Sequence, residues 1–476
     1  MRIIDRIYID GEFATARGDV QPLTNPTTEE PLGAVRLASR EDARAAIAAA
    51  VAAFPAMAAT SKAERLGMLE RMHAAVSARA AALAEATILE YGAPRQSAEF
   101  AMRFAIDSIL EAANALRAYE FTRWIRDAEV VMEPLGVVGV ITPWNANTSF
   151  ICSKLATALA AGCTAVIKPS EISALQTEIL TEALHEAGLP PGACNIVTGA
   201  GDAVGDELSR HPDVAKLSFT GSTAVGKAIM RASADTLKRL TLELGGKSPV
   251  VILDDADPET AARLAVAAAF RNNGQACVAG SRALVPRSLL GEVLPRLKAA
   301  AEATVVGDPD DPKTELGPLA SRAQWERVQG YIRKGVADGA TLLTGGEGRP
   351  GHLPRGYFVR PTVFVDATND MAIAREEIFG PVLSVIAYED ETDAVRIAND
   401  TPYGLRSYVV SADAGRAHRI GAQLQTGQVM INGFHNEPQA PFGGFKQSGL
   451  GRELGVFGLE AHLEPKVLLG RPRDVA

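Results

Sequence analysis

The first third of the chain has apolar residues at helical spacing, separated by polar residues that can begin and end helices. Two capping boxes, Ser39 with Asp42 and Ser61 with Glu64, place a hydroxyl three residues before a carboxylate, which indicates the first turn of a helix. The first predicted helix reaches about residue 54. The second runs to residue 91, where a glycine and a proline stop it, and a third spans about residues 98–116. The N-terminal region is therefore predicted to be helical.

From residue 136 onwards, short runs of β-branched residues alternate with helical stretches. One helix is expected near residues 149–161, and another is capped by Ser173 and ends at Gly188. Strands separated by helices of this length indicate βαβ units and a parallel sheet, which makes this region a candidate nucleotide-binding fold. The predicted strands cover residues 136–142, 164–169, 194–199, 216–221 and 237–243.

A second alternation of strands and helices follows Gly246 and predicts a further α/β unit. Two segments, residues 124–134 and 460–470, fit neither alternation. Each has the pattern of a lone strand, and a lone strand needs a partner sheet. Within the second unit the predicted strands lie near residues 248–255, 281–286, 341–343, 361–365 and 382–388, and the predicted helices near residues 258–271, 392–399 and 413–424.

Composition and charge exclude several classes of function. Apolar residues make up 47% of the chain and charged residues 22%, as in an ordinary globular protein. The net charge is -9 and no basic tract offsets it, which argues against a general nucleic-acid binder. No run approaches the roughly 20 apolar residues that span a bilayer. Asp5 and Asp10 interrupt the first residues, so neither membrane association nor a signal peptide is expected.

Cysteine and histidine usage points to a reducing compartment without a metal site. The four cysteines include no C-x-x-C pair and are too few for a disulfide framework in a chain of this length, so a cytoplasmic location is expected. The seven histidines are scattered, with no H-E-x-x-H motif and no Cys/His cluster, so no metal is expected.

Three side chains stand where chemistry could occur. Cys277 follows a helical stretch and Gly274, a setting that can expose a thiol among backbone N–H donors and favour the thiolate, although a small buried core cysteine would also fit. Glu243 ends a strand before two glycines, as either a base in a tight turn or one partner of a salt bridge. Asn145 follows the first sheet strand, as either an oxyanion donor or a helix cap.

Two further pairs could contact a nucleotide. Gly221 and Ser222 lie between a strand and a helix, where backbone N–H groups can hold a pyrophosphate. The usual G-x-G-x-x-G fingerprint is absent. Lys168 and Glu171 follow another strand of the same half, and could bind ribose hydroxyls or form a solvated ion pair.

Taken together, these motifs resemble the aldehyde dehydrogenase superfamily. PWN, KPSE, FTGS, LELGGK, GQAC, EEIFGP and PFGGFKQSGLGRELG occur in the family's order and spacing, and the resemblance covers essentially the whole chain. It implies an α/β fold with a Rossmann-type cofactor domain, an α/β catalytic domain and a small β oligomerisation arm. The implied boundaries are 1–115 with 135–245 for the NAD-binding domain, 246–447 for the catalytic domain, and 116–134 with 458–476 for the arm.

The resemblance implies a catalytic role for four residues. Cys277 would be the nucleophile that attacks the aldehyde to give a thiohemiacetal and then a thioester. Asn145 and the backbone N–H of Cys277 would stabilise the oxyanion. Glu243 would activate the water that hydrolyses the thioester, and Glu453 would help to organise the site or relay protons.

The implied cofactor is NAD. Glu171 would accept a hydrogen bond from the adenosine ribose and repel a 2′-phosphate, which makes NADP the less favoured alternative. Ser222 and Trp144 would lie near the pyrophosphate, and Glu377 would hold the nicotinamide ribose. The full set of implied cofactor-binding residues is Ile141, Trp144, Lys168, Ser170, Glu171, Gly221, Ser222, Gly245, Glu377 and Phe379.

The sequence departs from the family pattern at the expected substrate entrance. Ala146 and Asn147 replace the Phe-Pro that follows PWN in many members, and the segment that contains His435, Asn436 and Glu437 is polar. These differences predict a wider, more polar tunnel and leave an aryl, semialdehyde or amino-aldehyde substrate open.

Three alternatives to an NAD-dependent, non-acylating enzyme remain: a CoA-acylating semialdehyde dehydrogenase, a thiol esterase, and a non-catalytic structural protein. The presence of Glu243 favours hydrolysis, and the joint presence of Cys277 and Asn145 favours catalysis. The expected partners are a small-molecule aldehyde and further copies of the chain, as a homodimer or homotetramer.

Overall fold

The centre of the first half of the protein is a parallel sheet flanked by helices on both faces. The computed structural model describes residues 2–470. Its first large sheet has the order β20-β12-β11-β8-β9-β10-β2-β3, and its five central strands are parallel. Those strands agree with the five predicted ones and are β8 (Val137–Ile141), β9 (Thr164–Lys168), β10 (Cys194–Ile196), β11 (Val214–Thr220) and β12 (Arg239–Glu243).

Strand residues of this sheet alternate between two apolar cores. Val138 and Val140 pack among the helices of one face, whereas Val137 and Ile141 pack on the other. This division is what a buried parallel sheet requires. The first face is covered by α2 (Lys62–Ala78), α3 (Ala80–Tyr91), α4 (Arg95–Ala118), α5 (Asn147–Ala161) and α6 (Ala174–Glu186), and the second by α1 (Arg40–Ala58), α7 (Asp206–Arg210) and α8 (Thr223–Ser233).

The predicted N-terminal helices need two corrections. Both capping boxes are present, but the helix expected to run to residue 91 is two helices that meet at Arg79. Ser173 occupies the N-cap of α6 without accepting a bond. Instead, the buried Glu90 of α3 accepts bonds from the N–H groups of Leu175 (2.8 Å) and Gln176 (2.9 Å). A carboxylate from another helix therefore caps α6.

The prediction of an entirely helical first third is wrong, because five strands precede the first helix. β2 (Arg6–Ile9) and β3 (Glu12–Thr15) form a hairpin that extends the first sheet. Its turn is Asp10-Gly11, with φ of 54° and 84°. Asp-Gly is a strong hairpin signal, so the sequence YIDGEF contained the information. The other three strands, β1 (Ile3–Ile4), β4 (Val20–Thr24) and β5 (Pro31–Arg36), form a separate small sheet.

The second half of the protein contains a seven-stranded sheet, also covered on both faces. Its order is β15-β16-β17-β14-β13-β18-β19, and only β15 runs antiparallel to its neighbour. The strands are β13 (Pro249–Ile252), β14 (Arg282–Pro286), β15 (Thr341–Thr344), β16 (Thr362–Val365), β17 (Val382–Tyr388), β18 (Arg406–Val410) and β19 (Gln428–Ile431). The covering helices are α9 (Pro258–Phe270) and α10 (Leu290–Ala303) on one face, and α11 (Arg322–Ala337), α12 (Ala372–Arg375), α13 (Glu391–Asn399) and α14 (Ala414–Gly421) on the other.

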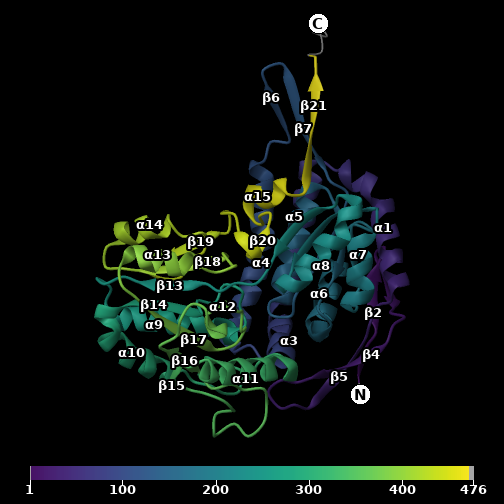
Figure 1. Cartoon of the computed structure of the whole chain (residues 1–476). Helices are drawn as coiled ribbons and strands as arrows, with labels where there is room; N and C mark the ends of the chain where they lie inside the picture. Colours follow the sequence, from purple (N-terminus) through teal and green to yellow (C-terminus); the bar gives the residue numbers. More distant parts are fainter. Residues whose placement is uncertain (1, 471–476) are drawn as a thin grey trace.

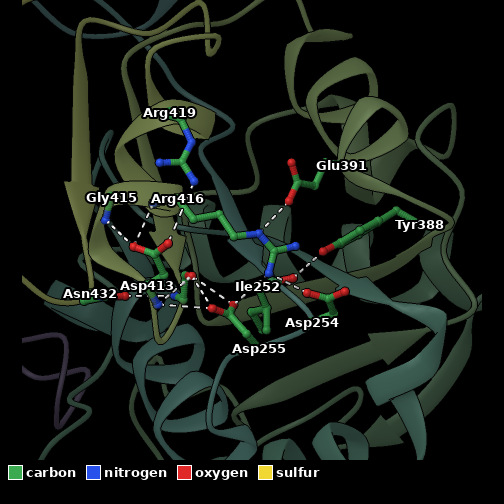
Figure 2. A network of polar contacts seen from close by, with 11 residues as sticks. Ile252, Asp254, Asp255, Tyr388, Glu391, Asp413, Gly415, Arg416, Arg419 and Asn432 are labelled. Carbon is green, nitrogen blue, oxygen red and sulfur yellow. Dashed lines mark hydrogen bonds and ion pairs between the residues drawn. The ribbon is translucent and has the colours of Figure 1, made fainter.

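A network of ion pairs fastens α13 and α14 to the ends of β13 and β18 (Figure 2). Arg416 contacts Asp254 at 2.6 Å, Asp255 at 3.3 Å and Glu391 at 2.6 Å. Ser411 donates its hydroxyl to Asp255, and its backbone N–H to Asn432 Oδ1 at 2.9 Å. The network therefore also fixes Asn432, the first residue of the loop after β19.

Three strands form an arm that projects from the body beside α15 (Gly455–Glu460) (Figure 1). β6 (Thr122–Ile125) and β7 (Ala128–Pro134) form a hairpin, and β21 (Leu463–Leu469) pairs with β7, with Val467 opposite Val130. The predicted single strand at residues 124–134 is therefore the end of β6, a turn and β7, and β7 is the partner of the predicted strand at residues 460–470. The expected arm also includes residues 471–476, which lie outside the described residues. No helix in residues 2–470 is long and apolar enough to cross a membrane.

Candidate active site

The carboxyl ends of β8 and β11 create a site for the predicted residues. The chain runs from β8 outwards through β9 and β10, then returns to the opposite side of β8 to form β11 and β12. Such a reversal in strand order leaves a crevice at the carboxyl edge of the sheet, where ligands bind in open α/β folds. Asn145 follows β8, Ser222 follows β11, and Glu243 ends β12, so three candidates share this edge.

Two glycines in the link between the large sheets bring the remaining candidates close. A Cβ atom on Gly245 would lie 2.5 Å from Glu377 Oε2, and one on Gly246 would lie 2.2 Å from the carbonyl oxygen of Cys277. The backbone N–H of Gly246 also donates to Glu377 Oε1 at 3.0 Å. Glycine is needed at both positions because the carboxylate and the cysteine loop occupy the space of a side chain.

The loop that contains Cys277 is fixed by two asparagines and a glutamine. Asn272 and Asn273 have positive φ, 53° and 59°, so the chain turns sharply after α9. Asn273 donates to the carbonyls of Gly92 and Pro318, both at 3.0 Å. The Gln275 side chain is also held, because its Oε1 accepts from the N–H of Ala320 at 3.0 Å.

Asn145 contacts this loop directly. Its Nδ2 donates to the carbonyl of Gln275 at 2.8 Å, and its own carbonyl accepts from Asn272 Nδ2 at 3.2 Å. The N-cap of α5 is Ala146, so Asn145 is not the helix cap that was its alternative reading.

The surroundings of Cys277 do not favour the thiolate, in contrast to the sequence-based expectation. Burial raises the pKa of the Cys277 thiol to about 12, and the charges of Glu377 and Glu243 raise it further. The positive charge of Arg406 acts in the opposite direction, but more weakly than the charge of either carboxylate. Cys277 is nevertheless a partly exposed residue, whereas Cys152, Cys163 and Cys194 are fully buried.

Glu243 is a buried carboxyl group without a protein partner. Its side chain is 2% exposed, and within the described chain neither oxygen has a hydrogen-bond partner. Burial raises its pKa well above the usual value, and the charge of Glu453 raises it further. Oε1 would lie 2.8 Å from a Cβ on Gly443, so the segment before β20 (Gly449–Leu450) covers it. Such a group can take up a proton near neutral pH.

Glu453 belongs to a polar group behind Glu243. It forms an ion pair with Lys154, and its Oε1 accepts a hydrogen bond from Ser218 at 3.2 Å. Lys154 Nζ also donates to Ser218 at 2.9 Å. Lys154 was not among the predicted residues, although a single lysine in the apolar stretch ICSKLATALA of α5 was a usable signal.

The residues expected to bind the cofactor line the same edge. Lys168 Nζ lies 3.4 Å from Glu171 Oε2 and donates to the carbonyl of Pro169 at 2.9 Å. Burial lowers the pKa of this lysine, whereas the Glu171 side chain is 36% exposed and therefore accessible. Of the other residues, Ile141 ends β8 and the buried Ser170 precedes the short helix at Glu171–Ser173.

A second group of expected cofactor residues lies around α8 and Glu377. Ser222 caps α8 and accepts from the N–H of Val225 at 3.3 Å. A Cβ on Gly221 would lie 2.4 Å from the Phe219 ring. Burial raises the pKa of Glu377 to about 7. Trp144 and Phe379 meet edge to face with ring centres 5.4 Å apart.

One residue expected at the substrate entrance lies elsewhere. Asn147 is fully buried; its Oδ1 accepts from Thr142 at 2.9 Å and its Nδ2 donates to Thr177 at 3.1 Å. It therefore joins α5 to α6 instead of widening a tunnel. In contrast, His435, Asn436 and Glu437 are exposed residues of the loop after β19, and their place at the substrate entrance stays a prediction. Within residues 2–470, no three His, Cys, Asp or Glu side chains are grouped as metal ligands.

Comparisons with known proteins identify the family to which the chain is similar. The sequence model described as the aldehyde dehydrogenase family matches residues 13–468. A 3-succinoylsemialdehyde-pyridine dehydrogenase from Pseudomonas sp. is 46% identical over 473 residues, 99% of each chain. A putative aldehyde dehydrogenase from Staphylococcus saprophyticus is 43% identical over 99% of each chain.

Solved structures of aldehyde dehydrogenases also match the fold of the chain. Aldehyde dehydrogenase C of Pseudomonas syringae, crystallised as a cysteine-to-alanine variant with NAD+ and octanal, is 43% identical with a TM-score of 0.97, over 99% of this chain and 98% of that one. Betaine aldehyde dehydrogenase of Staphylococcus aureus, in complex with NAD+, is 37% identical with a TM-score of 0.95, over 99% and 96%. The predicted α/β fold class is therefore confirmed.

Proposed function

Because the chain belongs to the aldehyde dehydrogenase family, we propose that it oxidises an aldehyde to the carboxylic acid with NAD+, through a thioester on Cys277. The observation that carries this proposal is the pairing of a partly exposed cysteine with a buried carboxyl group that has no partner within the described residues. Glu243 adds to the negative charge felt by the Cys277 thiol, so the two groups serve one site. An unsatisfied buried carboxylate is costly, and such groups concentrate where they handle protons.

The first half of the reaction needs the cysteine as a nucleophile. Cys277 loses its proton, and its sulfur bonds to the aldehyde carbon, so that the carbonyl oxygen becomes an oxyanion. The backbone N–H of Cys277 and the second N–H of the Asn145 amide would stabilise that charge. The first N–H of Asn145 already binds the Gln275 carbonyl, which keeps the amide beside the loop. The raised thiol pKa means that a base must assist, and the charges of Glu377 and Glu243 both act on the thiol. Glu243 is the better candidate because neither of its oxygens has a hydrogen-bond partner in the described chain, whereas Glu377 accepts from the N–H of Gly246.

The second half needs a base for water. Glu243 would take a proton from a water molecule as its oxygen bonds to the thioester carbon, and the Cys277 thiolate would leave as the carboxylic acid forms. The bond between Glu453 and Lys154 places a second carboxylate and an ammonium group behind Glu243. These groups would return the proton towards solvent.

The crevice at the carboxyl edge of the first sheet suits NAD. The N-terminus of α8 at Ser222 fits a pyrophosphate. The accessible Glu171 beside Lys168 fits ribose hydroxyls and opposes a 2′-phosphate. The glycine pair leaves room beside Glu377 for the second ribose. Bound there, the dinucleotide would supply the oxidising power of the reaction as a hydride acceptor.

The remaining expectations complete the proposal. The cofactor-binding part would comprise 1–115 with 135–245, the catalytic part 246–447, and the oligomerisation arm 116–134 with 458–476. The open edges of β6 and β21 carry exposed apolar residues, including Leu469 at 81%, which favours pairing with a further copy of the chain. The four cysteines are free, which suits a reducing cytoplasm.

The test is the formation of NADH, followed by absorbance, from a panel of aldehydes with and without CoA. The proposal expects turnover without CoA and the carboxylic acid as product. A strict requirement for CoA would indicate the acylating alternative. Hydrolysis of esters without any NADH from aldehydes would indicate a thiol esterase.

A further inference from the structure

Arg406, the first residue of β18, is a half-buried arginine whose charge no acid neutralises. Its Nε donates to Gln428 Oε1 at 3.2 Å, and its guanidinium carbon lies 5.9 Å from the centre of the Phe442 ring. Among residues 2–470, no carboxylate forms an ion pair with it. Burial lowers the pKa of Arg271, and the charge of Arg406 lowers it further, so a second cation lies nearby. Arg416 shows the contrasting case, because three carboxylates surround it (Figure 2).

The start of β18 lies beside the loop that carries Cys277. A Cβ atom on Gly246 would lie 3.5 Å from the Cβ of Leu405 and 2.2 Å from the carbonyl oxygen of Cys277. Tyr408 donates its hydroxyl to the carbonyl of the residue after Cys277 at 2.8 Å. Arg406 lies between these two contacts in the strand, and it shares the face of Tyr408 because alternate strand residues point to the same side. The guanidinium is therefore placed next to the nucleophile loop.

Arg406 supplies a positive charge to the Cys277 thiol. Burial raises the pKa of this thiol, the charges of Glu377 and Glu243 raise it further, and the charge of Arg406 lowers it. Burial also raises the pKa of Glu377 to about 7 and that of Glu243 well above its usual value, so both carboxyl groups lose charge by protonation near neutral pH. A guanidinium keeps its charge over this range. The influence of Arg406 therefore persists while that of the carboxylates is reduced.

Arg406 and the charges around Glu243 act on different members of the nucleophile and base pair. Transfer of the Cys277 proton to Glu243 leaves the total charge of the pair unchanged and moves the negative charge from oxygen to sulfur. Arg406 acts on the sulfur. A positive charge on that side favours the thiolate, because opposite charges attract strongly in a partly buried site. The charged groups that act on Glu243 are Glu453, Lys154 and Arg452.

A neutral partner holds the guanidinium without cancelling its charge. Gln428 is the register partner of Arg406 on β19, and its Oε1 accepts from both Nε and Nη2 of the arginine. A glutamate at this position would form a two-point ion pair with the guanidinium and neutralise it. The amide of Gln428 therefore fixes the position of Arg406 and leaves its charge available to Cys277.

Building on the proposed function, we propose that Arg406 is a positioning residue of the reaction, whose uncompensated charge favours the thiolate of Cys277 over the thiol. The proton of Cys277 passes to Glu243, and the sulfur then holds the electron pair that attacks the aldehyde carbon. Arg406 touches neither substrate nor cofactor in this role. It acts through the ionisation of Cys277.

The experiment measures alkylation of Cys277 by iodoacetamide between pH 7 and 9, without NAD or aldehyde. Because the thiol pKa is raised to about 12, the rate is proportional to the small thiolate fraction. Arg406→Gln should slow alkylation by about 10-fold at each pH, which corresponds to a rise of about one unit in the thiol pKa. Arg406→Lys should retain most of the rate because it keeps the charge. Mass spectrometry of the Cys277 peptide separates this reaction from any at the buried cysteines.

Gln428→Glu separates the charge of Arg406 from its structural contact. This variant keeps the size of the side chain and strengthens the contact, but places a carboxylate on the guanidinium. The proposal expects alkylation about as slow as in Arg406→Gln, whereas a purely structural role expects the wild-type rate. Gln428→Glu also provides the test if Arg406→Gln does not fold. As a matched control, Arg263→Gln removes an exposed arginine of α9 and should react at the wild-type rate.

The outcomes also separate this proposal from the proposed function. A wild-type rate in Arg406→Gln or in Gln428→Glu would overturn the role of Arg406, as would an Arg406→Lys variant as slow as Arg406→Gln. In the active enzyme, kcat/KM for the aldehyde should fall by a factor similar to that of alkylation. Slow alkylation in both uncharged and neutralised variants, without NADH from any aldehyde, would support the role of Arg406 and reject the dehydrogenase.

Discussion

Asn145 donates its side-chain amide to the carbonyl oxygen of Gln275 at 2.8 Å, and so joins the carboxyl edge of the first sheet to the loop that carries Cys277. One N–H of the amide is engaged and the other is free to donate to an oxyanion. Asn145→Asp keeps the size and replaces the donor with a carboxylate. We expect kcat to fall by about 100-fold or more, as when an oxyanion donor is lost. An unchanged kcat would exclude Asn145 from the oxyanion site.

Cys277→Ser should abolish the dehydrogenase activity and leave NAD binding intact. A hydroxyl ionises far less readily than a thiol, and burial already opposes ionisation at this position. NADH formation measures the activity, and quenching of tryptophan fluorescence measures the binding. Cys194→Ala, which changes a buried thiol on β10, should remain active. Retention by the serine variant of more than about a tenth of wild-type turnover would assign the nucleophile elsewhere.

Glu243→Gln should give one NADH per site and then stall at the thioester, because hydrolysis lacks its base. Rapid-mixing absorbance measures the burst, with the exposed Glu259→Gln on α9 as the control. A variant with no burst would show that Glu243 also takes the proton from Cys277, which the raised thiol pKa makes a specific alternative.

The same substitution should raise the stability of the protein at neutral pH. The pKa of Glu243 is raised in the folded state, so the unfolded chain loses this proton first as pH rises above about 4.5. Folding stability is therefore fully present below that pH and decreases as pH rises towards the folded pKa. The gain of Glu243→Gln over the wild type should be larger at pH 8 than at pH 4 in urea unfolding. A gain that does not vary with pH would contradict the raised pKa.

Stability should also depend on His462, which lies at the base of the arm. Burial lowers its pKa to about 3, its Nδ1 binds the Gly458 carbonyl at 2.8 Å, and within the described residues its Nε2 has no partner. Because only the unfolded chain takes up a proton between pH 6.5 and 3, this contribution is lost as pH falls through that range. The free energy of unfolding lost between neutral pH and pH 5 should be about 2 kcal/mol smaller for His462→Gln than for the wild type. Parallel stability curves for the two proteins would argue against a neutral His462.

Glu171→Gln should relax the preference for NAD. The change removes the charge that opposes a 2′-phosphate and weakens the bond to the ribose by about 1.5–3 kcal/mol. KM for NAD should therefore rise while KM for NADP falls, with kcat for the aldehyde little altered. If both constants are unchanged, Glu171 does not contact the ribose.

The arm should hold at least two chains together. Val467 and Leu469 are 52% and 81% exposed on β21, whose outer edge is unpaired in the described chain. Sedimentation at micromolar concentration should give a mass of at least twice 50.1 kDa. Replacement of both residues by glutamate should shift that mass downwards. A fully active monomer of the intact chain would contradict the assembly.

The parts of the fold that follow from local pattern were predictable, and the parts that depend on contacts between distant segments were not. β8 to β12 carry apolar, often β-branched residues between helical stretches, so their strands and order of appearance could be identified from the sequence. The hairpin at Asp10-Gly11 had a signal that the helical pattern nearby obscured. The cap of α6 by Glu90 had none, because the two segments are 85 residues apart.

In the candidate site, too, some features were predictable from local sequence and others depended on tertiary contacts. Motifs placed Glu243 at a strand end and Ser222 before a helix, where the structure has them, and the structure has Cys277 in the loop after α9. Spacing could not show that Asn147 bonds to Thr177, nor that carboxylates near Cys277 oppose its ionisation. Both effects depend on which side chains meet after folding.

The five residues between β12 and β13 limit how far the two large sheets can move relative to each other, and therefore limit changes in the separation of the reacting groups. Glu243 belongs to one sheet and Cys277 is attached to the other, so a slide of the sheets by 1 Å would change the gap between base and nucleophile while every strand pairing survived. The carboxylate of Glu377 lies against Gly245, and the carbonyl of Cys277 lies against Gly246. These close contacts oppose such a slide. Gly246→Ala would therefore displace Cys277 relative to Glu243, and impair both half-reactions, before it unfolded either half of the molecule.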